Sequence, residues 1–472
     1  MRWRSPRSCP PPRRCPTMSE HFSTIAAIST PPGKGGVALI RVSGPEAFAV
    51  VLRVFRPRGK SLPWERPRTA VYGDFLSEGE VIDDGLVTAF PAPASYTGED
   101  TVELSCHGGV LITRTLLEAL FLAGAVPAPA GEFTRRAYLS GRLGLTEAEA
   151  IATLLDAKST AQVRLSAARG VLAERLDAYY RELLTLTSSA EAVIDFPEED
   201  LAELSTEELT RRLHALREGM TALTGSYRTG RSVTEGVRAV IVGRPNVGKS
   251  CLYNLLVGEE AAIVSDTPGT TRDLLERTVP LGRVLLRLTD TAGLHASDDP
   301  IETLGMDRAR RAMEEAELLL SVFDASAPLT DEDRALMAAL PKGRTAVAIL
   351  NKSDLPTRID RQEIEARFEN LVEMSATCGT ATALCELCDR LFTDGALSIG
   401  EDPIVSSARQ YAALCRTCEA LTAAEGALLA GMPADMYLAD LEAALSALGE
   451  VDGRTVNEEI VREIFSHFCV GK

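Results

Sequence analysis

The sequence is poor in aromatic residues and in positive charge, and it has no long apolar run. Aromatic side chains make up 5% of 472 residues, and 67 acids outnumber 50 bases, so the formal net charge is −17. A membrane span needs about 20 apolar residues, and we therefore expect no contact with a membrane. A chain this acidic is poorly suited to gripping nucleic acid by itself, because phosphate contacts need Lys and Arg. If the protein acts on RNA, we expect a local basic patch or a basic partner.

A secretory signal is also missing, although the chain has ten cysteines. This combination favours a reducing cytosol over a disulfide framework, so we expect a cytoplasmic protein. Cys385-Glu-Leu-Cys388 and Cys415-Arg-Thr-Cys418 form two CxxC pairs, a pattern that can bind zinc. The gap between the pairs is long for a zinc ribbon, and both lie in segments with a helical pattern. We therefore interpret these cysteines as small core residues.

The first 17 residues differ from the rest, with five arginines, no acid and a cluster of prolines. They have neither the apolar core nor the amphipathic pattern of a targeting peptide. We expect a disordered tail or a start codon assigned too early, with folded sequence from Met18 onward.

The pattern of apolar residues changes three times along the chain. Alternating runs at 36–42, 70–75 and 101–105 predict strands in an N-terminal α+β region, which also has a predicted helix at 110–124. Helical periodicity follows over 145–191 and 206–229, and it returns after residue 380. Between these helical parts, residues 237–375 alternate short apolar strands with helices, which is typical of a buried, mostly parallel sheet. We predict an N-terminal extension (1–17) and an N-terminal α+β domain (18–138). A helical domain follows in two parts (139–233 and 395–472), and an α/β domain (234–394) is inserted between these parts.

A phosphate-binding loop is the clearest motif. Gly243-Arg-Pro-Asn-Val-Gly248-Lys249-Ser250 matches G-x4-G-K-S, and it lies between a predicted strand (237–242) and a predicted helix (249–256). Its backbone N–H groups would surround the phosphates, with Lys249 reaching the β and γ phosphates and the Ser250 hydroxyl binding Mg²⁺.

Four further motifs follow in the order expected of a GTPase. Thr270-Thr271 occupies the place of a switch loop that supplies a Mg²⁺ ligand, and Asp290-Thr-Ala-Gly293 would hold Mg²⁺ through water and contact the γ phosphate. The Asp of Asn351-Lys-Ser-Asp354 can accept both N–H donors of guanine, which selects GTP over ATP. Ser375-Ala-Thr377 would close the base pocket through backbone contacts. Together the motifs predict a Ras-like P-loop G domain.

Small GTPases of the Ras type carry a Gln after this Asp-Thr-Ala-Gly, but here the residue is Leu294. Another group must therefore position the attacking water. Asn246 could help to bind a monovalent cation between the phosphates. Glu302 could orient the water through a second water, although its spacing also suits a surface carboxylate at a helix start.

The motifs together resemble one family, the MnmE (TrmE) GTPases of tRNA modification. The similarity covers nearly the whole chain from Met18. The inserted domain shares GRPNVGKS, SDTPGTTRD, DTAGL with a following IETLG, and NKSD. The N-terminal part shares TPPGKGGVALIRVSG, SYTGEDTVELSCHGG and GEFTRRAYLSGRLGLTEAEAI, and the chain ends Phe468-Cys-Val-Gly-Lys472 like the family's Cys-x-Gly-Lys.

The resemblance implies a folate-binding N-terminal domain that forms a homodimer, a helical-bundle domain and the inserted G domain. It implies a K⁺-dependent GTPase that acts with the FAD-dependent partner MnmG. Together they would add an aminomethyl or carboxymethylaminomethyl group to C5 of the wobble uridine (position 34) of certain tRNAs. The one-carbon donor would be 5-formyl- or methylene-tetrahydrofolate.

Site residues follow from matching the family's motifs. The catalytic residues would be Glu302, Asn246 and Lys249; Mg²⁺ would be bound by Ser250 and Thr271, and K⁺ by Asn246, Ser265, Thr267 and Thr270. Contacts to GTP would come from Asn246, Val247, Gly248, Lys249, Ser250, Cys251, Ser265, Thr267, Thr270, Thr271, Asp290, Thr291, Ala292, Gly293, Asn351, Lys352, Asp354, Ser375, Ala376 and Thr377.

Folate would be bound by Arg41, Glu103, Arg142 and Lys472. Arg142 stands where the family has Lys, which keeps the charge but changes the geometry. Cys469 near this site is either a nucleophile or a plain buried thiol, and the sequence does not decide between them.

Two other functions remain open at this stage. Ribosome-assembly GTPases share the same G-domain motifs, but they usually carry a KH-type domain or a second G domain, and neither is evident here. The second alternative is a non-enzymatic folate-sensing switch, whose GTP cycle regulates another protein, and the motifs do not exclude it.

Overall fold

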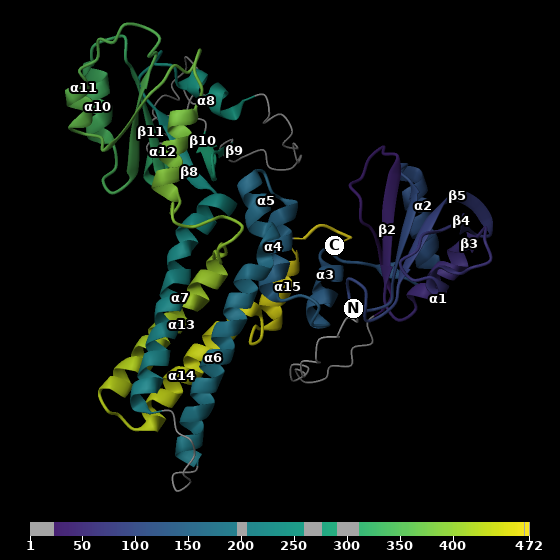
Figure 1. The fold of residues 1–472 in the computed structure, drawn as a ribbon. Helices are drawn as coiled ribbons and strands as arrows, with labels where there is room; N and C mark the ends of the chain where they lie inside the picture. The colour runs from purple at the N-terminus through teal and green to yellow at the C-terminus, as the bar shows by residue number, and fades with distance from the viewer. Residues whose placement is uncertain (1–22, 196–204, 259–275, 290–310, 467, 472) are drawn as a thin grey trace, which may run out of the picture. The chain divides into compact units, whose positions relative to one another are not determined.

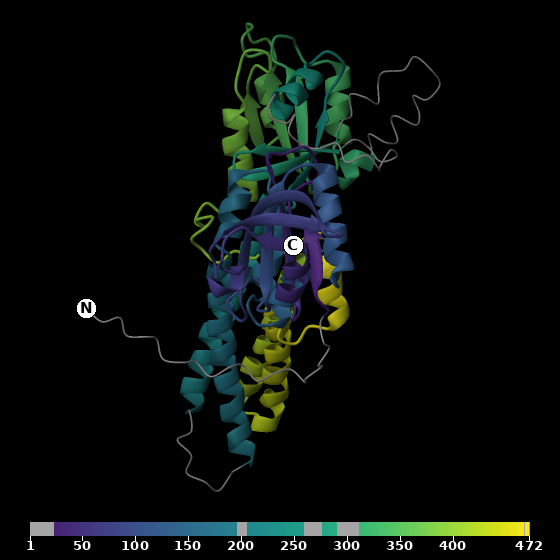
Figure 2. The same cartoon turned by 90° about the vertical axis from the view of Figure 1, so that its right-hand side faces the viewer.

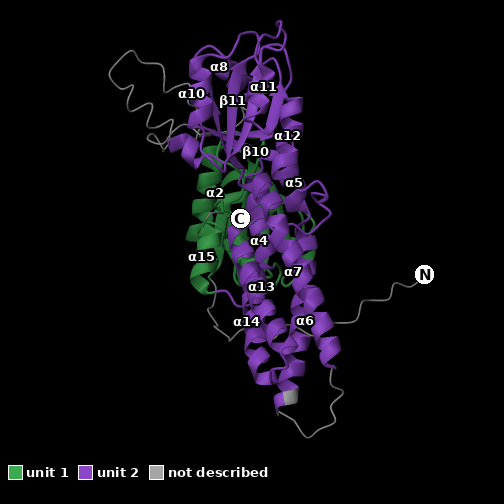
Figure 3. Ribbon diagram, turned by 90° about the vertical axis from the view of Figure 1, so that its left-hand side faces the viewer, with its two compact units in different colours: residues 1–143, 457–472 green, residues 144–456 purple. Residues whose placement is uncertain are grey.

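The computed structural model describes residues 23–195, 205–258, 276–289, 311–466 and 468–471. These residues form two compact units, one of residues 1–143 with 457–472 and one of residues 144–456 (Figure 3). The last helix, α15 (Glu458–Ser466), therefore belongs with the N-terminal part of the chain rather than with the helices that precede it. Within the described residues, no helix combines the length and the apolar character that crossing a membrane requires.

The first unit is built on a seven-stranded sheet in the order β3-β4-β5-β6-β2-β1-β7. Its strands are β1 (Ile25–Ile28), β2 (Val37–Ser43), β3 (Phe55–Pro57), β4 (Val71–Ser77), β5 (Glu80–Phe90), β6 (Thr101–His107) and β7 (Val126–Pro127). Its helices are α1 (Ala47–Val54), η1 (Pro63–Glu65), α2 (Val110–Leu122), α3 (Glu132–Leu139) and α15. Alternate residues of β2 and β6, including Ile40, Val42 and Leu104, are fully buried in one core with α1 and α2, as the alternating pattern predicts.

The C-terminal segment is tied to this unit by specific contacts. A backbone bridge joins Ala130 to Val470, and the Ser29 hydroxyl donates to the carbonyl of Gly471 at 3.0 Å. Gly131 has a positive φ of 68°, and a Cβ there would lie 2.3 Å from the carbonyl oxygen of Phe465. Only glycine allows this close approach between α3 and the end of α15. Cys469 is exposed here, so the alternative of a buried thiol is wrong.

The helices of the second unit are α4 (Leu145–Leu155), α5 (Thr160–Ala167), α6 (Arg169–Asp195), α7 (Thr206–Thr234), α13 (Ala408–Leu429) and α14 (Ala434–Asp452). Figures 1 and 2 show α6, α7, α13 and α14 running side by side as two long pairs. Their leucines form one core, with Leu183, Leu421 and Leu441 at its centre. The single helical pattern predicted at 145–191 is three helices, and Ser159 begins the second of them, α5, by accepting from the Gln162 N–H.

The G domain is inserted between α7 and α13 as a six-stranded sheet in the order β13-β12-β11-β8-β10-β9. Its strands are β8 (Val237–Val242), β9 (Glu276–Leu281), β10 (Val284–Thr289), β11 (Leu318–Asp324), β12 (Thr345–Asn351) and β13 (Asn370–Glu373). Its helices are α8 (Lys249–Val257), α10 (Asp331–Ala339), α11 (Arg361–Glu365) and α12 (Thr382–Phe392). All neighbouring strands are parallel except β9 and β10, which confirms the mostly parallel sheet predicted from the sequence.

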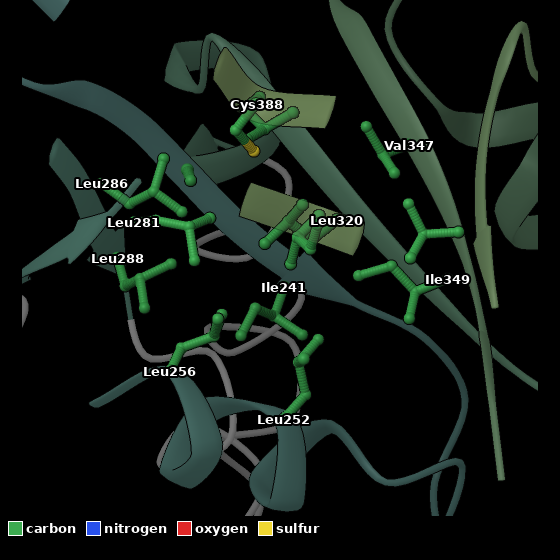
Figure 4. Packing of buried hydrophobic residues seen from close by; sticks show 14 of the residues in the cluster. Ile241, Leu252, Leu256, Leu281, Leu286, Leu288, Leu320, Val347, Ile349 and Cys388 are labelled. Carbon is green, nitrogen blue, oxygen red and sulfur yellow. The ribbon is translucent and has the colours of Figure 1, made fainter. Parts of the chain in front are cut away.

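Successive residues of each central strand pack into different cores. In β8, Ile241 joins a core with α8 and α12 that is shown in Figure 4, whereas Val240 and Val242 join a core with α10 and α11. Because both faces are covered, the strands are apolar without interruption. This arrangement places the loops that follow β8 and β12 at one end of the sheet.

Candidate nucleotide site

The P-loop follows β8 and ends at the N-terminus of α8. Gly248 has a φ of 99°, and a Cβ there would lie 2.1 Å from Nδ2 of Asn351, so this position excludes any side chain. Asn246 also has a positive φ, 62°, and its side chain is exposed. The backbone N–H groups at the start of α8, together with the helix dipole, make this loop a ready site for phosphate.

Lys249 folds back over the P-loop. Its Nζ donates to the carbonyl oxygens of Gly243 at 2.8 Å and Arg244 at 2.9 Å. Burial lowers the pKa of this amine below its ordinary value of 10.5. Both acceptors are neutral carbonyls. A phosphate oxygen carries negative charge and would therefore accept a stronger hydrogen bond from this amine.

Asn351 joins the P-loop to the predicted base-binding loop. Its side chain is 3% exposed; Nδ2 donates to the carbonyl of Val247 at 2.8 Å and Oδ1 accepts from the N–H of Ala376 at 2.9 Å. One buried amide therefore holds three sequence motifs together. Sequence reasoning assigned the motif's role to its Asp and missed this bridge, although a buried Asn at a strand end always requires such partners.

Lys352 and Asp354 lie on the loop after β12. Lys352 has a φ of 65° and pairs with Asp324 at 2.5 Å. Burial works against ionisation of Asp324, but hydrogen bonds from Lys352 and Ser326 outweigh it and hold the pKa of this carboxyl below its ordinary value. Asp354 is exposed in the same loop.

The remaining predicted G-domain residues divide into two groups. Ser375 and Ala376 are buried and Thr377 is exposed in the loop after β13, while Ser250 and Cys251 are exposed in the first turn of α8. The other residues lie outside the described part of the chain: Ser265, Thr267, Thr270, Thr271, Asp290, Thr291, Ala292, Gly293, Leu294 and Glu302.

The predicted folate residues lie in the first unit, except that Lys472 is outside the described residues. Arg41 and Glu103 face each other across β2 and β6 and form an ion pair at 2.8 Å. The Arg41 guanidinium also lies 5.3 Å from the ring centre of Tyr96 and 5.6 Å from that of Phe133. Arg142 is exposed at the end of the segment after α3. The structure thus brings Arg41 and Glu103 together beside two aromatic rings.

A buried ion-pair network next to these residues was not predicted. Arg136 is 3% exposed and contacts Glu99 at 2.9 Å and Glu132 at 3.0 Å. Glu99 in turn accepts from Ser43 at 2.9 Å. This network fixes the loop between β5 and β6, whose sequence SYTGED stood out only as a family motif.

The two CxxC pairs lie in different cores. Cys388 is fully buried in the core under α12, and Cys418 packs against the helical-bundle core. Burial raises the pKa of the Cys388 thiol to about 12, so it stays protonated at neutral pH. Both observations favour the interpretation of these cysteines as packing residues.

Comparisons with known proteins agree with this site. Residues 24–142 match the family model "GTP-binding protein TrmE N-terminus", and residues 145–469 match "MnmE helical domain". The chain is 42% identical over 455 residues to the tRNA modification GTPase MnmE of Symbiobacterium thermophilum, covering 95% of this chain and 99% of the relative. It is 38% identical over 457 residues to the protein of the same name from Thermotoga maritima, covering 96% of this chain and all of that one.

Solved structures similar to part of this chain include the GTPase Era of Aquifex aeolicus bound to GDP and aluminium fluoride. That match covers 39% of this chain and 66% of Era, with 24% identity and a TM-score of 0.26. The two MnmE relatives match over nearly the full length of both chains, which confirms the resemblance indicated by the motifs. The chain belongs to the MnmE family of tRNA modification GTPases.

Proposed function

We propose that this chain is a K⁺- and Mg²⁺-dependent GTPase that modifies tRNA together with an FAD-dependent partner of the MnmG type. The proposed product is an aminomethyl or carboxymethylaminomethyl group on C5 of the wobble uridine. The observation that carries the proposal is the Asn351 bridge, because it sets the phosphate-binding and base-binding loops of a GTPase in one rigid arrangement.

In the proposed site, Lys249 exchanges its two carbonyl partners for the β and γ phosphates. Asp354 accepts the two N–H donors of guanine, and the backbone of Ser375–Thr377 closes the base pocket. The exposed hydroxyl of Ser250 suits a Mg²⁺ ligand, since this ion prefers oxygen and is held in such sites by a P-loop Ser or Thr. Thr271 is proposed as the second protein ligand.

Asn246 is the proposed K⁺ ligand within the P-loop, and its exposed amide oxygen in a left-handed turn fits a hard cation. Ser265, Thr267 and Thr270 are proposed to complete the K⁺ site. A cation there supplies the positive charge that an arginine finger supplies in other GTPases. Glu302 is proposed to orient the attacking water.

The proposed folate site consists of Arg41, Glu103, Arg142 and Lys472. Basic side chains suit the carboxylates of a folate glutamate tail, and the partly exposed ring of Tyr96 beside Arg41 offers an apolar surface for a pterin. We also propose the homodimer, a cytoplasmic location and the domain limits 18–138, 139–233, 234–394 and 395–472, except that residues 457–472 group with the first unit rather than with the helices that precede them. The proposed one-carbon donor is tetrahydrofolate that carries a formyl or a methylene group.

Two measurements test the proposal. GTP hydrolysis by the purified chain should be strongly faster in K⁺ than in Na⁺ at equal ionic strength, and equal rates would refute the role of the cation. Mass spectrometry of tRNA from a strain that lacks the gene should show loss of the wobble modification. An unchanged level of that modification would favour a ribosome-assembly GTPase or a folate-sensing switch instead.

A further inference from the structure

An open pocket lies at the end of the six-stranded sheet opposite the P-loop. It has a volume of about 290 Å³ and is lined by the end of α7, the residue before β11, the start of β12 and the last residue of α12. Because β8, β11 and β12 are parallel and the P-loop follows the carboxyl end of β8, this pocket at the amino ends lies on the far side of the G domain from the nucleotide. The same α7 residues connect the helical bundle to the G domain.

Three arginines and one glutamate line the pocket: Arg228, Arg231, Arg344 and Glu317. Arg231 pairs with Glu317 at 2.8 Å and with Glu235 at 3.3 Å, and Glu317 also lies 3.7 Å from Arg238, so both carboxylates are already engaged. Within the described residues, Arg228 and Arg344 meet no carboxylate, and each donates instead to a backbone carbonyl, of Leu391 at 2.6 Å and of Glu314 at 2.7 Å. The lining therefore has a formal charge of two positive in a chain of net charge −17.

One of these arginines, Arg228, lies against an aromatic side chain. The Arg228 guanidinium lies 6.0 Å from the ring centre of Phe392, which is buried, and Tyr227 stacks on Tyr411 with 4.3 Å between ring centres. Stacked rings hold Tyr227 and Arg228 on a rigid wall rather than on a mobile loop. Guanidinium groups fixed this way still present unused N–H donors, since each has five and forms a planar fork that matches phosphate oxygens.

We propose that this arginine pocket (Arg228, Arg231 and Arg344) takes a backbone phosphate of the RNA on which the chain acts. The inference rests on the proposed function, since it supplies the local basic patch that an acidic protein needs to contact tRNA. The overall negative charge does not prevent such contact, because screening limits charge effects to about 8 Å at physiological salt. The volume of about 290 Å³ lies at the lower end of the roughly 300 to 1,000 Å³ that small-molecule pockets span, so the pocket has room for a phosphate group.

The test measures binding of the full-length protein to end-labelled tRNA by fluorescence anisotropy. Affinity is measured at several KCl concentrations between about 50 and 200 mM, a range over which the affinity of phosphate contacts changes steeply. The variant R228Q/R344Q should bind roughly tenfold more weakly at the lowest salt, as expected for loss of one or two charge-assisted hydrogen bonds. Its slope of log Kd against log salt should fall by about 1, because fewer counterions are released. The variant R228K/R344K keeps both charges and should retain most of the slope.

The matched control is R277Q/R283Q, which removes two exposed arginines from β9 and from the turn between β9 and β10, at the edge of the same sheet. It should leave affinity and slope at the wild-type values. Equal losses in this control and in R228Q/R344Q would overturn the pocket, because they would indicate only a general effect of net charge. Thermal unfolding of each variant shows whether a loss of binding is a loss of folding. The single variant R344Q changes only an exposed turn, and it should still lower the slope of log Kd against log salt.

The two hypotheses fail in distinguishable ways. Wild-type binding with an unchanged slope in R228Q/R344Q overturns the pocket, while K⁺-stimulated hydrolysis and the modification assay still support the function. Loss of the wobble modification in the deletion strain, with no tRNA binding by the wild type at any salt, likewise overturns the pocket alone. Binding of inorganic phosphate that depends on Arg228 and Arg344, without any change in the tRNA slope, would assign the pocket to a free anion and overturn the RNA proposal.

Discussion

Positive charge is arranged differently at the two ends of the G-domain sheet. At the carboxyl end, Lys249 is half buried, and its amine is held by two carbonyls of its own loop. At the amino end, Arg228 and Arg344 are exposed, and their guanidinium groups donate to backbone carbonyls. A buried lysine depends on its ligand for compensation, whereas an exposed arginine does not. The buried lysine at the carboxyl end suits tight, specific binding of one phosphate chain. The exposed arginines at the amino end suit a weaker contact that salt screens.

The largest expected effect comes from removing the cation at the carboxyl end. Lys249→Ala should lower kcat of GTP hydrolysis by about 10² to 10³, the usual cost of losing one group that stabilises developing charge. Lys342→Ala, an exposed lysine at the other end of the sheet, should leave the rate unchanged. Steady-state phosphate release in K⁺ measures both. Similar losses in the two variants would erase the distinction between the ends.

Asn351→Ala should come next, because it leaves the carbonyl of Val247 and the N–H of Ala376 without their partner. Each buried group left unsatisfied costs about 1 to 3 kcal/mol, so the free energy of unfolding of the G domain should fall by an amount in or above this range. Affinity for a fluorescent GDP analogue should fall as well, since two loops lose their common anchor. Asn370→Ala, a partly exposed amide on β13, provides the control and should change neither quantity by much.

Unchanged stability and affinity in Asn351→Ala would mean that the two loops are held together by something other than this amide.

Cys388→Ser tests the core between α12 and the sheet, which belongs to neither end. The side chain is fully buried against apolar neighbours, and a hydroxyl without a partner there should cost about 1 to 3 kcal/mol of stability. Cys385→Ser, only partly buried on the same helix, should cost less. Chemical denaturation measures both, with GTP hydrolysis at low temperature as the readout that should stay normal. Equal costs, or loss of bound zinc, would contradict a packing role.

The smallest expected effect is the titration of Lys249 in the nucleotide-free protein. Burial lowers its pKa in the folded state, so between the folded and the unfolded pKa the unfolded chain holds more protons and stability rises with pH. Below that window the charged amine destabilises the fold, and Lys249→Gln should therefore melt at a higher temperature than the wild type. The difference should shrink as pH rises toward 10.5, the ordinary pKa of lysine.

Differential scanning calorimetry of the two proteins at several alkaline pH values gives this difference directly. Excess GDP with Mg²⁺ should reverse it, because the phosphates then stabilise the charged amine. A difference that does not vary with pH would show that burial of Lys249 is not the cause.

The parallel strands of the G domain and its P-loop could be predicted because their signals are local, whereas the antiparallel edge strand β9 was missed. Apolar runs such as 237–242 and 345–351 need only the rule that buried parallel strands are apolar throughout, and Gly248 follows from the motif. The arginine pocket could not be predicted, since Arg228, Glu317 and Arg344 are far apart in sequence and form no motif. The same holds for residues 457–471, which have an ordinary helical pattern but pack with the first unit. Pairing between distant segments is decided by tertiary packing, which periodicity does not encode.

The covalent path between the helical bundle and the G domain has a consequence for modularity. The chain leaves α7 for β8 and returns after α12, and the two segments are neighbours, since the N–H of Asp394 donates to the Thr229 hydroxyl at 2.8 Å and that of Val405 to Ser226 at 3.0 Å. The residues that form the bundle core all lie outside 238–392. Joining the two segments directly would close only a short loop, which costs little entropy. The helical bundle therefore has a core of its own, to which the nucleotide-binding module contributes no residue of the described part of the chain.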